Sequence, residues 1–166
     1  IKALSKNGYR ADVSGLVSKV SSCCTNRCFA NLIVSKNDYA NGSYHSSLDY
    51  INRALKINPE SKTCICQKAK VLAAMGHMDK ALNAIDKILF KDPYHLDALD
   101  VKKSIMMSKK DLHASLELCD RIIAYNPVDA VARRDKAEIL EDLGRYKDAF
   151  DTYRETLNVK EDVDFF

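Results

Sequence analysis

Five cysteines are the strongest candidates in this sequence for a metal-binding site. They are Cys23, Cys24, Cys28, Cys64 and Cys66, and thiolates from neighbouring elements can complete a tetrahedral zinc site. The spacing is poor for zinc, because no Cys-x-x-Cys pair occurs and a helix would place Cys64 and Cys66 on different sides. We therefore interpret these cysteines as small buried residues and linker thiols, and predict neither a metal nor another cofactor.

Other candidates for catalysis are weaker still. The histidines have no Asp or Cys at ligand spacing on the same face, so we interpret them as solvated polar residues; they are His45, His77, His95 and His113. The sequence contains no GxGxxG or Walker loop, no HExxH and no nucleophile elbow. We predict that the chain is not an enzyme.

The composition is typical of a soluble helical protein. The chain has 166 residues, of which 46% are hydrophobic and 30% charged, enough for a substantial core. Its apolar runs are too short to span a bilayer, and the first residues lack a secretory signal pattern. Six cysteines suggest disulfides only in small secreted domains that lack a core. We predict free thiols, no membrane span and a cytoplasmic location.

The charge pattern argues against nucleic-acid binding. The net charge is +3, and Lys and Arg alternate with acids along most of the chain instead of forming one basic face. The sign does change along the sequence: residues 1–36 are mainly basic, whereas residues 135–164 are rich in Asp and Glu. We expect a molecule whose two ends differ in charge.

A sequence repeat indicates the arrangement of the helices. The chain has only three prolines, Pro59, Pro93 and Pro127, and they are spaced 34 residues apart. A fixed period of this length is typical of stacked helical hairpins that cannot bury their apolar faces alone. With the proline at position 32, the units are 28–61, 62–95, 96–129 and 130–163.

Other positions follow the same period. Position 15 is Gly42, Gly76 and Gly144 in three units, where a first helix would end with a residue at positive φ. Lys110 takes this place in the third unit, so we expect a differently shaped or more strained turn there. Four stripes of apolar or small residues at helical spacing then predict second helices that begin at Tyr44, Met78, Leu112 and Tyr146.

This pattern resembles the tetratricopeptide repeat (TPR) family. The resemblance covers residues 28–163 and rests on the period, the position 15 glycines, the prolines and the small residue at position 20; that residue is Ser47, Ala81, Ser115 or Ala149. The sequence departs from the family at position 7, where Lys68, Lys102 and Lys136 replace the usual Leu. The resemblance implies an all-α, right-handed superhelical solenoid of antiparallel helix-turn-helix repeats.

The two ends of the chain are less regular. Residues 1–27 look like a degenerate half repeat and linker, because Gly8 precedes Gly42 by 34 residues but no proline follows. The tail, residues 164–166, ends in Phe165 and Phe166 without a polar capping helix, which solenoids need for solubility. We infer that the chain is a fragment of a longer protein or that a partner covers its end.

The resemblance also implies where a ligand would bind. In this family, positions 2, 5, 9, 12 and 13 of the first helix line an inner groove, and helical spacing places them on one stripe. The candidate groove residues are Phe29, Leu32, Lys36, Tyr39, Cys66, Lys70, Asp97, Asp100, Ser104, Met107, Arg134, Glu138 and Glu141. Their early part is apolar with two lysines, and their later part is mainly acidic.

These residues predict a non-catalytic scaffold that binds a peptide or helix of a partner protein. A ligand with basic residues facing the later, acidic part would fit. The carboxylate clamp of chaperone-binding family members is absent, since Leu32, Lys36, Gln67, Asp97 and Val101 occupy its positions. Two alternatives stay open. The chain could assemble head to tail through its oppositely charged ends, or it could be the recognition arm of a larger enzyme, such as the glycosyltransferases that carry these repeats.

Overall fold

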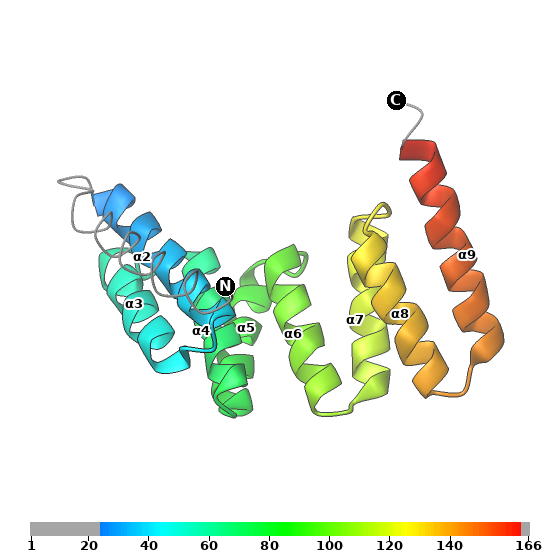
Figure 1. Ribbon diagram of the computed structural model, residues 1–166, viewed down its shortest axis with the longest axis horizontal. Helices are drawn as coiled ribbons and strands as arrows, with labels where there is room; N and C mark the ends of the chain where they lie inside the picture. The colour runs from blue at the N-terminus through cyan, green and yellow to red at the C-terminus, as the bar shows by residue number, and fades with distance from the viewer. Residues whose placement is uncertain (1–23, 164–166) are drawn as a thin grey trace, which may run out of the picture. The chain divides into compact units, whose positions relative to one another are not determined.

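The computed structural model of the chain describes residues 24–163, and within this range the chain forms helices without strands (Figure 1). The helices alternate with short turns. They are α2 (Cys24–Ala40), α3 (Tyr44–Ile57), α4 (Lys62–Ala74), α5 (Met78–Lys91), α6 (Leu96–Ser108), α7 (Leu112–Tyr125), α8 (Ala130–Asp142) and α9 (Tyr146–Val163). The predicted half repeat in residues 1–27 and the tail in residues 164–166 lie almost wholly outside the described residues.

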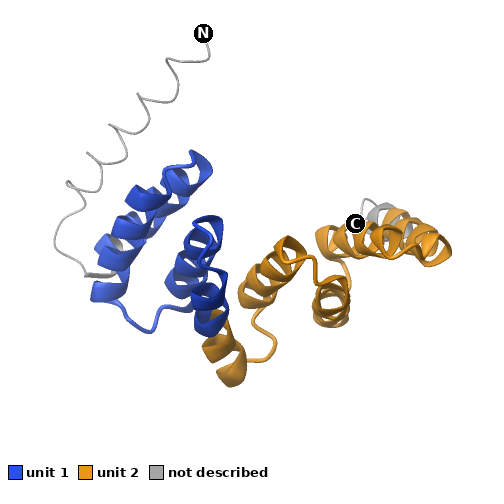
Figure 2. Cartoon of the chain, turned by 90° about the horizontal axis from the view of Figure 1, so that it is seen from below, with its two compact units in different colours: residues 1–84 blue, residues 85–166 orange. Residues whose placement is uncertain are grey.

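The chain divides into two compact units, residues 1–84 and residues 85–166, with the boundary inside α5 (Figure 2). In the first unit, α2 packs against α3 and α4, and α3 also packs against α4. In the second unit, consecutive helices pack in turn, α6 on α7, α7 on α8 and α8 on α9. Each unit is therefore built from antiparallel hairpins that share apolar faces.

The second helices begin at the first residue of each predicted stripe, and three of them end just before a proline. They start at Tyr44, Met78, Leu112 and Tyr146. Helices α3, α5 and α7 each end one residue before an Asn or Asp that precedes a proline. A residue before a proline is disfavoured in the helical region of backbone conformations, so the Asn or Asp ends the helix. Helix α9 has Glu161 where a fourth proline would stand, and it continues to Val163 with 18 residues instead of 14.

The turn at Lys110 is strained but not differently shaped. Lys110 has a φ of 59°, in the same left-handed region as Gly76 at 84°. Its N–H donates to the carbonyl of Met107, and the N–H of Asp111 donates to that of Met106, as in the other first-helix ends. Of the two alternatives that we expected, the structure shows the more strained turn and not the differently shaped one. The three other units fix this geometry with glycine, and here a lysine is forced into it.

Replacing Lys110 by glycine is expected to stabilise the protein. A side chain in the left-handed region costs about 1–2 kcal/mol, and the extra freedom of glycine in the unfolded chain offsets only part of that gain. We expect Lys110→Gly to raise the free energy of unfolding by about 0.5–1 kcal/mol in urea denaturation. The matched control is Gly144→Lys, which should lose stability; a neutral or destabilising Lys110→Gly would contradict the strain.

The two helices of a hairpin cross where position 8 meets position 20. In the first repeat both are serines, and Ser35 Oγ lies 2.9 Å from Ser47 Oγ in the core. The second and fourth repeats place fully buried alanines at position 8, Ala69 and Ala137. The third repeat places Lys103 there, and this side chain is also buried. A charged residue at a crossing of small residues sets the third repeat apart.

Candidate functional site

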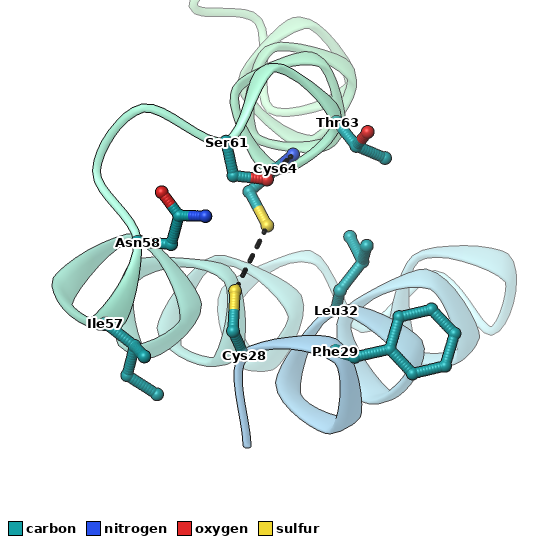
Figure 3. Close-up of a pocket in the computed structure, with 8 residues that line it drawn as sticks. All are labelled: Cys28, Phe29, Leu32, Ile57, Asn58, Ser61, Thr63 and Cys64. Atoms are coloured by element: carbon teal, nitrogen blue, oxygen red, sulfur yellow. Dashed lines mark hydrogen bonds between the residues drawn. The ribbon is translucent and has the colours of Figure 1, made fainter. Parts of the chain in front are cut away.

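The first unit contains a cavity of about 400 Å³ between α2, the α3–α4 turn and the start of α4 (Figure 3). Two thiols face each other in it, with Cys28 Sγ 3.9 Å from Cys64 Sγ. Burial and the neighbouring Cys64 raise the pKa of the Cys28 thiol above its ordinary value of 9.0. Phe29 lies at the rim and is 62% exposed. The cavity thus has an uncharged lining of apolar side chains, thiols and three polar side chains (Asn58, Ser61 and Thr63), next to an exposed aromatic ring.

The predicted groove residues of the first unit divide between this cavity and the core. Phe29 and Leu32 line the cavity, although Leu32 is only 6% exposed. Cys66 is 3% exposed. We expected Leu32 and Cys66 on the groove surface, and the structure buries both because α2 packs directly against α4. Lys36 is exposed, and Tyr39 is half-buried with its ring 5.7 Å from that of Tyr44.

The thiols among the described side chains are free and buried. They are Cys28, Cys64, Cys66 and Cys119. Burial raises the pKa of the Cys119 thiol to about 11. No three His, Cys, Asp or Glu side chains in the described part of the chain lie together in a way that could hold a metal ion. Cys23 lies outside the described residues.

The predicted groove residues of α6 include a carboxylate that already forms an ion pair within the helix. Asp97 is exposed, whereas the Asp100 carboxylate lies 3.1 Å from Lys103 Nζ. Ser104 is exposed and donates its hydroxyl to the Asp100 carbonyl at 2.9 Å, and Met107 is half-buried. On this helix Asp97 is therefore the better placed carboxylate for a ligand, because binding through Asp100 would compete with an internal ion pair.

Lys103 forms a buried ion pair in the second unit. Its Nζ lies 2.6 Å from Asp135 Oδ2 on α8, and the two side chains are 3% and 13% exposed. Burial alone would lower the pKa of Lys103, but hydrogen bonds and the charges of Asp135 and Asp100 outweigh it and raise the pKa above 10.5. The pair joins the third repeat to the fourth and was not found from the sequence.

The exposed face of α8 carries the remaining predicted groove residues. Arg134, Glu138 and Glu141 are all exposed, and Arg134 Nε lies 3.6 Å from Glu138 Oε1. Burial, and to a smaller extent the charges of Glu141 and Glu138, raise the pKa of Tyr153 on α9 above its ordinary value of 10.0. This surface of the second unit is acidic, apart from one arginine.

The fold can be compared with that of known proteins. A thermophilic TPR protein of Thermus thermophilus superposes with a TM-score of 0.68 at 20% identity, covering 81% of this chain and 75% of that one. A crystal structure of MamA gives 0.71 at 12% identity, covering 97% and 92%. A fragment of MamA from Desulfovibrio magneticus gives 0.67 at 12% identity, covering 81% and 76%. No protein-family model and no curated protein matches the sequence.

The comparisons and the helices agree on the fold. The helices of this chain superpose on those of the structural relatives, and the prediction of an all-α solenoid of helix-turn-helix repeats is confirmed. In the described part of the chain, no helix is both long and apolar enough to cross a bilayer. The chain has the fold of the tetratricopeptide-repeat proteins.

Proposed function

We propose that this chain is a non-catalytic module that binds a segment of another protein through exposed residues of its first helices. The observation that carries the proposal is Phe29, a large aromatic side chain that is 62% exposed beside a cavity of about 400 Å³. Exposed aromatic rings next to apolar concavities mark recognition sites, because water is displaced there at little cost. The same fold in the structural relatives supports a role in protein interaction.

In the first unit, the segment places an apolar side chain in the cavity next to Phe29. Leu32, Ile57 and two thiols line the cavity together with the uncharged polar side chains of Asn58, Ser61 and Thr63. Such a site accepts an aliphatic or aromatic anchor and disfavours a charged one, which would lose hydration without a partner. Lys36 is exposed farther along α2 and favours an acidic or polar residue in the segment.

In the second unit, exposed carboxylates select basic side chains. Asp97 on α6 and both Glu138 and Glu141 on α8 are exposed. Charges at the edge of a binding surface raise the rate of association and reject partners of like charge more than they add affinity. The segment that binds the second unit is therefore basic, and its binding weakens as salt is raised.

The test compares two phenylalanines of the same chain. A partner is first captured from native extract on the immobilised protein, and the affinity of its binding segment is then measured by calorimetry. We expect Phe29→Ala to weaken binding by about tenfold or more, as truncation of an aromatic anchor does. The matched control is Phe90→Ala, because Phe90 is 89% exposed but lies on the second helix α5.

Two results would count against the proposal. Equal losses for Phe29→Ala and Phe90→Ala would mean that the first helices have no special role. If the double variant Asp97→Lys with Glu138→Lys kept the affinity and the salt dependence of the wild type, the exposed carboxylates would have no role in binding. Circular dichroism of each variant must match that of the wild type, so that lost binding is not lost folding.

A further inference from the structure

Helix α9 presents an apolar stripe to solvent at positions that earlier repeats cover. Tyr146 is 71% exposed, Phe150 66% and Leu157 65%. These are positions 17, 21 and 28 of the fourth repeat, and they lie on one face of the helix. Among the described helices of the second unit, only α8 packs on α9 (Figure 1).

The same positions are covered wherever a first helix follows. In the third repeat they are Leu112, Leu116 and Ile123, all half-buried, and α8 packs on the helix that carries them. In the first repeat Tyr44, Leu48 and Leu55 are half-buried where α4 packs on α3. The stripe of α9 therefore has the pattern of a surface that receives one more helix, and three large side chains remain exposed on it.

The covering helices are held in register by a recurrent ion pair. Lys102, at position 7 of the third repeat, lies 2.7 Å from Asp86, at position 25 of the second. Lys136, at position 7 of the fourth repeat, lies 2.6 Å from Asp120, at position 25 of the third. At these two junctions, lysine at position 7 of the covering helix thus meets aspartate at position 25 of the helix that it covers. At the α3–α4 junction the corresponding residues are Lys68 and Asn52.

On α9 the charge of this contact is reversed. Position 25 of the fourth repeat is Arg154, which is exposed and lies 3.2 Å from Asp151 in its own helix. Lys147, about two turns earlier on the same edge of the stripe, is also exposed. A covering helix with lysine at position 7 would be repelled here, whereas one with Asp or Glu would form the same ion pair in the opposite sense.

We propose that α9 is a docking surface for an amphipathic helix of a partner protein that carries an acidic residue facing Arg154. The partner helix buries its apolar face on Tyr146, Phe150 and Leu157 and fixes its register through the carboxylate, as helices bound in hydrophobic grooves do through anchors three and four residues apart. A second copy of this chain fits less well, since the described part of α2 exposes Arg27 and Lys36, which are basic like the edge that they would meet.

Two synthetic peptides test the charge of the contact. Each is a stapled, fluorescein-labelled amphipathic helix of about five turns with a leucine stripe; one carries Glu at the position that faces Arg154, and the other carries Lys. Binding to the full chain is measured by fluorescence polarisation. We expect the Glu peptide to bind about fivefold more tightly than the Lys peptide, and we expect Arg154→Glu to reverse that order.

Apolar contacts are tested in the same assay. Phe150→Ala is expected to weaken binding of the Glu peptide by about tenfold, whereas the control Phe90→Ala leaves it unchanged. Equal affinities of the two peptides, or the same order in Arg154→Glu, would overturn the proposal. Self-association in light scattering that Phe150→Ala abolishes would also overturn it, because the occupant would then be a second copy. Neither outcome depends on Phe29, so this surface and the proposed binding site can fail separately.

Discussion

Lys103→Ala is expected to lower the free energy of unfolding by about 3 kcal/mol, the lower end of the range for a broken buried ion pair. The substitution removes the ammonium that lies 2.6 Å from Asp135 and leaves that carboxylate, only 13% exposed, without its main partner. Arg134, 3.2 Å from Asp135, compensates for part of the loss. The measurement is urea denaturation followed by circular dichroism, with an unchanged dependence on urea concentration as evidence that folding stays two-state.

The matched control removes both charges. Lys103→Met with Asp135→Leu fills the site with apolar side chains of similar size, and we expect it to regain stability to within about 1 kcal/mol of the wild type. If the double variant were as unstable as Lys103→Ala, the loss would come from packing and the charge argument would be contradicted.

The pH dependence provides a second control with a definite sign. The pKa of Lys103 is raised in the folded protein above its ordinary value of 10.5. The folded state therefore holds this proton more tightly than the unfolded chain, and the resulting stability is complete below pH 10.5 and lost as the pH rises through the folded pKa. Above pH 10.5, the free energy of unfolding of the wild type should therefore fall relative to that of the double variant.

Leu89→Ala and Leu157→Ala are expected to differ strongly although both leucines occupy position 28 of a repeat. Leu89 is 9% exposed, and its truncation should cost about 2–4 kcal/mol through lost burial and a residual cavity. Leu157 is 65% exposed, and its truncation should cost less than about 0.5 kcal/mol. Thermal and urea unfolding of the two variants measure the difference directly.

The comparison also tests whether the stripe on α9 is free. Ile85→Ala serves as a positive control, because Ile85 is fully buried and must be costly. A loss for Leu157→Ala as large as that for Leu89→Ala would show that another part of the molecule already covers α9. The docking proposal would then lose its basis.

Most of the fold could be predicted from the sequence because its signals repeat. Prolines, turn glycines and apolar stripes at one period locate the helices, and local rules decide where they end. The turn at Lys110 shows the limit of such rules. The absence of glycine indicates strain, but the turn keeps the left-handed geometry of the other units with a lysine in place of glycine.

The site could be predicted only in part, since burial is decided by neighbouring helices. Leu32 and Cys66 share a face with exposed groove residues, yet the packing of α2 on α4 buries them. Lys103 was missed because its partner Asp135 is 32 residues away in the next repeat. A signal did exist: lysine stands at position 8, where Ser35, Ala69 and Ala137 are small. The exposed stripe of α9 has the same residue pattern as the covered ones, so sequence alone cannot separate them.

The central claim, that exposed residues of the first helices bind a protein segment, is tested most directly by site-specific photo-crosslinking. A benzophenone side chain is placed at position 29 or 138 on first helices, and at position 90 on a second helix, in the intact chain, with the captured partner present. We expect crosslinks to the partner from positions 29 and 138 and little or none from position 90. Crosslinks from position 90 alone, with none from the first helices, would contradict binding through the first helices.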